Sequence, residues 1–184
     1  MAKRGVSGVS TREILMDAGA DSAAIHYHFG SKDALMAAVF NRRLHVQRDG
    51  ARRVLEAKMA AGGPLTARDL AEAIVLPIAE LAEDETEGRY YLGFVMALLH
   101  YPPLAHLRAE ADSWMKVVLA AYKEVAPGLS NLDRRRRVGF AAFAAMGALS
   151  SGPVNVWYDK FMQKPGVMAA ALIDFISSGL SSEA

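Results

Sequence analysis

The sequence predicts an all-helical protein, with a helix-turn-helix near its N-terminal end and a larger helical body after it. Three observations support this fold class. Ala, Leu and Met dominate the apolar residues, and these residues favour helices. Apolar side chains recur at helical spacing along most of the 184 residues. Glycine and proline fall between the periodic segments, where they end helices.

Residues 10–32 contain two short helical patterns joined by a tight turn. Gly19 ends the first pattern, because glycine adopts the left-handed conformation at little steric cost. Asp21 or Ser22 can cap the second helix, which we expect to end near His28. Ile14, Leu15 and Ala18 give the first helix an apolar face, and we expect the second helix to bury Ile25 and Phe29. In a helix-turn-helix, the second helix lies in the DNA major groove.

Gly, Pro and capping residues divide the remaining chain into longer helices. We expect these helices at residues 31–61, 66–83, 89–100, 104–125, 131–151 and 166–180. Gly50 is a possible weak point of the first. Pro77 should kink the second and open space beside it. The helix over 89–100 is apolar nearly all round, which predicts that it lies in the middle of the body.

Composition excludes several classes of protein. The absence of cysteine excludes disulfides and thiolate chemistry, and fits a cytoplasmic protein. No apolar run reaches the length of a membrane span, and no signal-peptide pattern is visible. The net charge is only +1, but residues 1–53 hold nine basic and five acidic residues, a net +4. A basic head on a mildly acidic body suits a polyanion bound at one end, although a solvated helix face would look the same.

The residues of the helix-turn-helix match a known family closely. Ser10-Thr11-Arg12-Glu13-Ile14, then Ala18-Gly19, then Ile25-His26-Tyr27-His28-Phe29-Gly30-Ser31-Lys32 followed by Leu35, resembles the DNA-binding domain of the tetracycline-repressor (TetR) family. The resemblance covers about residues 4–40. It implies a DNA-binding domain over 1–48 and a helical effector-binding and dimerisation domain over 49–184, with which the rest of the chain is compatible in pattern and length.

The resemblance also assigns residues to DNA contacts. It places Thr11 and Arg12 near the phosphates and Tyr27 and Lys32 on the DNA backbone. It places Ser22, Ala24 and His26 against base edges. Alanine can touch only a thymine methyl, whereas serine and histidine can each make one hydrogen bond. The predicted DNA-binding residues are Thr11, Arg12, Ser22, Ala24, His26, Tyr27 and Lys32.

Residues 1–9 depart from the family pattern. A TetR-type domain has a full amphipathic helix before the helix-turn-helix, and Ala2-Lys3-Arg4-Gly5 resembles only the end of that helix. The first helix is therefore largely missing, as if the chain starts too late or is truncated. We expect residues 1–9 to be flexible. We also expect a loosened head, because its large apolar side chains lose part of their cover: Ile14, Ile25, Phe29, Leu35 and Val39.

The family analogy implies a pocket in the body for a small, largely apolar effector. Aromatic and apolar residues of the helices over 89–100 and 104–125 are the candidates, and an ordinary core would account for them equally well. The predicted ligand-binding residues are Tyr90, Tyr91, Phe94, Met96, Trp114, Leu119 and Tyr122.

The last two helices carry broad apolar faces, and in TetR-like proteins such helices form a four-helix bundle with a second copy. We therefore expect a homodimer through residues 131–151 and 166–180, as a two-fold symmetric DNA operator would require. We expect the basic run Arg134 to Arg137 to be a solvated rim or a source of salt bridges.

No catalytic constellation, cofactor motif or metal site is visible. His26 and His28 are two residues apart on a helix and point in nearly opposite directions, so they cannot share one ion. The resulting hypothesis is a sequence-specific transcriptional regulator that binds a double-stranded DNA operator and acts as a repressor released by a small, largely apolar effector. The alternative is a helical small-molecule-binding dimer that does not itself bind DNA.

Overall fold

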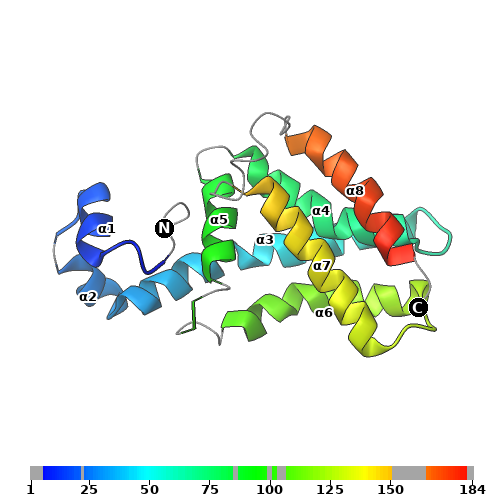
Figure 1. The fold of residues 1–184 in the computed structure, drawn as a ribbon, viewed down its shortest axis with the longest axis horizontal. Coiled ribbons are helices and arrows are strands. Elements are labelled where there is room, and N and C mark those ends of the chain that lie inside the picture. The colour runs from blue at the N-terminus through cyan, green and yellow to red at the C-terminus, as the bar shows by residue number, and fades with distance from the viewer. Residues whose placement is uncertain are drawn as a thin grey trace.

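The computed structural model describes residues 6–21, 23–84, 87–98, 101–102, 107–150 and 165–181, and the regular structure in these residues is helical throughout. Figure 1 shows a small head at one end of a long helix and a body packed around the rest of that helix. The head comprises α1 (Thr11–Asp17), α2 (Ala24–Phe29) and the first turns of α3 (Lys32–Ala60). The body adds α4 (Ala67–Glu83), α5 (Gly88–Leu98), α6 (Leu107–Val125), α7 (Asn131–Leu149) and α8 (Pro165–Ser181). The predicted fold class is confirmed.

The central helix of the body is α4. It contacts α3, α5, α6, α7 and α8, and Leu70, Ala71, Val75 and Ala82 are completely buried along it. Most of α5 is buried, as expected for the helix over 89–100, although Tyr90 remains 42% exposed, but α4 rather than α5 is the helix that contacts all the others of the body. The many alanines of α4 explain the difference, since small side chains let several helices approach one axis closely.

The contact between α3 and α4 is closest at Gly50 and Pro77. A Cβ atom at Gly50 would lie 2.7 Å from Cβ and 2.8 Å from Cγ of Pro77, closer than atoms can pack. Both residues are buried, and α4 continues as a helix through Pro77. The sequence-based interpretations of both residues therefore need correction. Gly50 is a packing position rather than a weak point, and α3 fills the space beside the proline.

A second close approach fixes the start of α5. A Cβ atom at Gly88 would lie 1.6 Å from the carbonyl oxygen of Leu81, in the last turn of α4. Only glycine fits here, because the neighbouring atom belongs to the backbone. The α4–α5 junction therefore depends on the absence of a side chain at residue 88.

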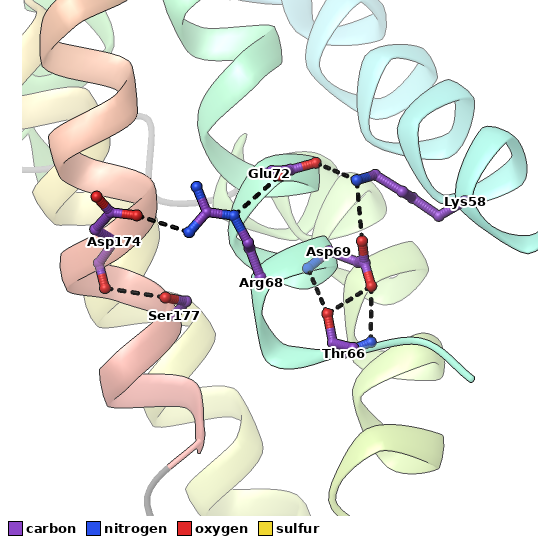
Figure 2. A network of polar contacts seen from close by, with 7 residues as sticks. All are labelled: Lys58, Thr66, Arg68, Asp69, Glu72, Asp174 and Ser177. Carbon is purple, nitrogen blue, oxygen red and sulfur yellow. Dashed lines mark hydrogen bonds and ion pairs between the residues drawn. The ribbon is translucent and has the colours of Figure 1, made fainter. Parts of the chain in front are cut away.

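A polar network joins α3, α4 and α8 at the opposite end of α3 from the head (Figure 2). Thr66 caps α4: its hydroxyl accepts the N–H of Asp69, while its own N–H donates to the Asp69 carboxylate at 2.9 Å. The Lys58 ammonium lies 3.1 Å from that carboxylate and 2.6 Å from the carboxylate of Glu72. Arg68 extends the network to α8 through Asp174, at 2.7 Å.

The environment of Asp69 favours its charged form. Burial opposes ionisation, but hydrogen bonds from the hydroxyl and N–H of Thr66 and from the Lys58 ammonium outweigh it. The pKa of Asp69 therefore lies below its ordinary value. A carboxyl group with a lowered folded-state pKa stabilises the fold above its unfolded-state pKa, and this stabilisation is lost as pH falls through the folded-state pKa.

Replacing Gly50 with alanine should lower the free energy of unfolding by about 1–3 kcal/mol, because the added methyl group overpacks against Pro77. The higher helix propensity of alanine should offset up to about 1 kcal/mol of this loss. The matched control is Gly139→Ala in α7, where no atom lies within 4 Å of the added Cβ, so only the gain from propensity is expected. Urea unfolding at one protein concentration measures both variants. Equal stability of the two would contradict a tight α3–α4 contact at Gly50.

Replacing Asp69 with asparagine should lower the free energy of unfolding at pH 7 by about 1–2 kcal/mol, because hydrogen bonds to a charged group are lost. The difference from the wild type should shrink as pH falls below about 4, because the carboxyl of the unfolded chain takes up a proton there while the folded one, with its lowered pKa, still resists it. Urea unfolding at pH 7, 5 and 3 tests this. Asp174→Asn is the control, since that carboxylate is 67% exposed and should contribute less than about 1 kcal/mol at any pH. A difference in the free energy of unfolding between the wild type and Asp69→Asn that stays constant down to pH 3 would contradict a stabilising role for the charged Asp69 carboxylate.

Candidate nucleic-acid interface

The first turn of α1 presents two of the predicted phosphate contacts to solvent. Ser10 and Glu13 form a capping box, in which the Ser10 N–H donates to the Glu13 carboxylate at 2.7 Å and the Glu13 N–H donates to the Ser10 hydroxyl at 3.2 Å. Thr11 and Arg12 follow this cap directly, and both side chains are exposed. Among the described residues Arg12 has no ion pair, so its guanidinium is available to a phosphate oxygen.

Two glycines with positive φ delimit the second helix of the motif. Gly19 has φ 60° and ends α1, and Gly30 has φ 77° and ends α2, as the sequence predicts. The start of α2 differs from the prediction. Ala23 is its N-cap residue and supplies no side-chain bond, while the Asp21 carboxylate accepts the N–H of Ala23 at 2.8 Å. Ser22, the other predicted cap and a predicted base contact, lies outside the described residues.

The solvent-facing side of α2 carries His26 and Tyr27. The Nδ1 atom of His26 lies 3.0 Å from the Gly30 carbonyl oxygen. A carbonyl only accepts, so Nδ1 must carry the proton, and Nε2 of the neutral ring remains an acceptor for a base amino group. Tyr27 is 83% exposed, and its ring stands nearly perpendicular to that of His28, with the ring centroids 4.9 Å apart. Ala24 is half-buried, which leaves it a smaller surface for a thymine methyl.

Lys32 holds the N-terminal segment instead of projecting freely to solvent. Its ammonium donates to the carbonyl oxygens of Val6, at 2.7 Å, and Val9. Both valines are buried, with 3% and 5% of their surfaces exposed. Residues 6–9 are therefore packed against the head, in contrast to the flexible segment that we expected. This role of Lys32 was not predicted from the sequence, although two valines three residues apart are a signal for a buried face.

The apolar cover of the head is uneven. Leu15 and Ile25 are buried, so the expected loss of cover does not extend to Ile25. Phe29 and Val39, in contrast, keep 40% and 41% of their surfaces exposed. The prediction that Phe29 is a buried core residue is wrong: the chain turns at Gly30 directly after it, and α2 contacts mainly α3 and α1. In the described head, Val9, Leu15 and Ile25 are buried outside the main hydrophobic cluster, whereas Val6 and Met36 belong to the cluster that continues into the body.

Polar contacts at three positions, Asp33, Phe40 and Arg43, tie the first half of α3 to the body. The Tyr101 hydroxyl donates to the Asp33 carboxylate at 3.2 Å. On α5, the buried Tyr91 hydroxyl donates to the Phe40 carbonyl at 2.9 Å, and burial raises the pKa of Tyr91 so that it remains a donor. Arg43 lies 2.6 Å from the Glu87 carboxylate, which directly precedes α5. The segment of α3 that follows the head is thus fixed to α5 and its neighbours.

The predicted ligand-binding residues do not share one environment. Tyr91, Phe94, Trp114 and Tyr122 are buried, and the Tyr122 hydroxyl donates to the Leu180 carbonyl at 2.8 Å. The hydroxyls of Tyr91 and Tyr122 therefore both already donate to backbone carbonyls. Met96 and Leu119 are half-buried, and Tyr90 faces solvent. On α5, Arg89 was not among the predicted residues, and its buried Nε has no hydrogen-bond partner among the residues that the structure describes.

Neither of the following two grooves, which lie in the described part of the body, is lined by α5. One groove of about 360 Å³ lies between α7 and α8, with Phe140, Ala144, Phe175 and Ile176 in its wall. The other, of about 230 Å³, lies between α6 and α7 and includes Leu119, the only predicted ligand residue in either described groove. The basic run on α7 also differs from expectation at Arg134, which is buried rather than part of a solvated rim.

A comparison with known protein families shows what the head is similar to. The family model for bacterial regulatory proteins of the tetR family matches residues 1–39, which include α1, α2 and the start of α3. No curated protein matches the chain. None of the helices in the described residues is long and apolar enough to cross a membrane. By this match, residues 1–39 are similar to the helix-turn-helix DNA-binding domain of bacterial regulatory proteins of the tetR family, which suggests a DNA-binding transcription regulator.

Proposed function

We propose that the protein is a homodimeric repressor that leaves its operator when a small, largely apolar effector binds the body. The observation that carries this proposal is the continuity of α3. This single helix runs from Lys32, beside the helix-turn-helix, to Ala60 in the body. A displacement of the body helices that contact α3 would therefore change the position of the head.

The effector would act on α3 through α5. Tyr91 and Glu87 contact α3 at Phe40 and Arg43, and Phe94 and Met96 lie on the same helix as Tyr91. A ligand that packs against α5 would change these contacts, and the unpartnered Arg89 Nε would give it one polar anchor. Coupling between two sites of this kind typically changes affinity by about 5–150-fold.

An exposed apolar face on α7 and α8 supports dimerisation. Phe140 is 71% exposed, Phe143 48% and Phe175 73%. All three lie in the helices that are predicted to dimerise, so a second copy could cover them. Covering each phenylalanine with a second copy would contribute roughly 1.5–3 kcal/mol. Two heads related by two-fold symmetry would then meet two half-sites about one DNA turn apart.

In the proposed complex, α2 enters the major groove, with His26 at base edges and Tyr27 on the DNA backbone. Thr11 and Arg12 meet the phosphates from the first turn of α1. Lys32 can contact phosphate only if its ammonium releases the Val6 and Val9 carbonyls. The proposal therefore assigns the main salt-dependent contact to Arg12.

Replacing Arg12 with glutamine should weaken binding to DNA from the gene's own upstream region. The slope of log affinity against log salt should decrease by about 0.9 per head, because one phosphate contact is lost. Arg53→Gln, which changes a similar charge on α3 but breaks only a pair with Glu80, should leave the slope unchanged. Fluorescence anisotropy at several salt concentrations measures both.

The salt dependence of DNA binding should also be measured for the variant Lys32→Gln. If Lys32 holds residues 6–9 rather than phosphate, this variant loses affinity with an unchanged salt slope. Wild-type protein that binds no DNA even at low salt would overturn the repressor proposal. It would favour the alternative of a helical small-molecule-binding dimer.

Replacing Phe140 or Phe175 with aspartate should dissociate the dimer, because each substitution buries a charge at the proposed interface. Sedimentation equilibrium should report a mass that falls from twice 19.8 kDa to 19.8 kDa. Met59→Asp, which is 60% exposed near the end of α3, is the control and should remain dimeric. A monomeric wild type would exclude this interface, whereas a dimer that survives both phenylalanine variants would place the interface elsewhere.

A further inference from the structure

The groove between α6 and α7 has an unusual lining. It is formed by Leu119 and Lys123 of α6 and by Asn131, Arg134 and Arg135 from the first two turns of α7. Three of these five residues are cationic, and none is acidic. It shares no residue with the apolar groove between α7 and α8.

Arg134 is a buried cation without a carboxylate partner. Only 6% of its surface is exposed. Its Nη1 donates to the Ala126 carbonyl at 2.8 Å and its Nη2 to the Asn131 side-chain oxygen at 2.9 Å, both of which are neutral. Among the described residues no carboxylate pairs with it. Burying a charge is costly unless an opposite charge compensates it, so this position favours an anion nearby.

The other polar groups of the groove are available donors. The Asn131 oxygen already accepts from Arg134, which leaves its amide N–H₂ as a donor. Within the described part of the chain, Lys123 and Arg135 form no ion pair. The carboxylate of Asp133, on the same turn of α7, is held instead by the Ser130 hydroxyl at 2.5 Å and by Arg136 at 3.4 Å. The chain thus offers cations and an amide donor here, with no acidic partner in the lining.

We propose that this groove binds a small organic anion. Its carboxylate would be held by Lys123 and Arg135 and stabilised by the buried charge of Arg134, while its apolar part would pack on Leu119. The volume of about 230 Å³ lies below the roughly 300–1,000 Å³ typical of drug-sized ligands, which favours a short carboxylic acid. This site is separate from the DNA-binding head and does not depend on the proposed repressor function.

The test uses hexanoate as the probe, with the full-length protein at constant ionic strength and pH 7. Thermal unfolding and ligand-detected NMR should show saturable binding of hexanoate and none of hexanol, which has the same chain length without the carboxylate. The double variant Lys123→Gln/Arg135→Gln should weaken hexanoate binding at least tenfold. Arg136→Gln is the matched control, because it removes a neighbouring charge that pairs with Asp133 outside the groove, and its affinity should stay within twofold of the wild type.

Inorganic phosphate is the second probe. Saturable binding of phosphate without hexanoate would overturn the assignment to organic acids. Binding that the double variant and the Arg136 control weaken equally would reduce the effect to general attraction by positive charge. Failure of the wild type to bind either anion would remove the site altogether.

Discussion

The close contact between α3 and α4 at Gly50 and Pro77 is the constraint on which the rest of the structure depends. A glycine without a side chain meets the face of a proline ring, and α4 in turn contacts every other helix of the body. Pro77 lacks the N–H that a helix interior normally uses, so α4 gives up one hydrogen bond at this point. Because α3 also supports the head, this contact sets the position of the head relative to the whole body.

Polar groups then orient α3 on this apolar framework. Near the head, Asp33, the Phe40 carbonyl and Arg43 each meet a partner from the body, and Lys58 does so at the far end. Exposed ion pairs of this kind contribute about 0–1 kcal/mol each, and a buried hydroxyl–carbonyl bond about 1 kcal/mol. Apolar packing therefore supplies most of the stability, while these contacts select one register of α3. They are also the contacts that a bound effector could change at small energetic cost.

The basic residues of this molecule differ in whether their charged groups already have partners within the chain. Lys32 satisfies two backbone carbonyls of the N-terminal segment, and Arg134 satisfies one backbone carbonyl and one amide oxygen. Arg12 remains exposed on the head. The net charge of the head thus overstates the number of cations ready for DNA. Local geometry, rather than a count of basic residues, decides which cations can meet an outside anion.

The sequence by itself determined the fold class, most helix boundaries and the family of the head. These features depend on local signals: apolar spacing, the caps Ser31 and Thr66, and glycines that must adopt positive φ. The motif from Ile25 to Lys32 was sufficient for the family because its residues are specific as well as periodic. The exposed positions of Thr11, Arg12 and Tyr27 likewise follow from the helical pattern.

Only the tertiary structure decided which helix is central, what Gly50 does and where the ammonium of Lys32 lies. A strongly apolar pattern over 89–100 suggested the centre of the body, but small side chains on α4 allow more neighbours than large ones on α5. The partners of Gly50 and Lys32 lie about 25 residues away in sequence, at Pro77 and Val6, and no local pattern announces them. The burial of Arg134 without a carboxylate has the same origin, because helical periodicity shows which face a side chain occupies but not what it meets there.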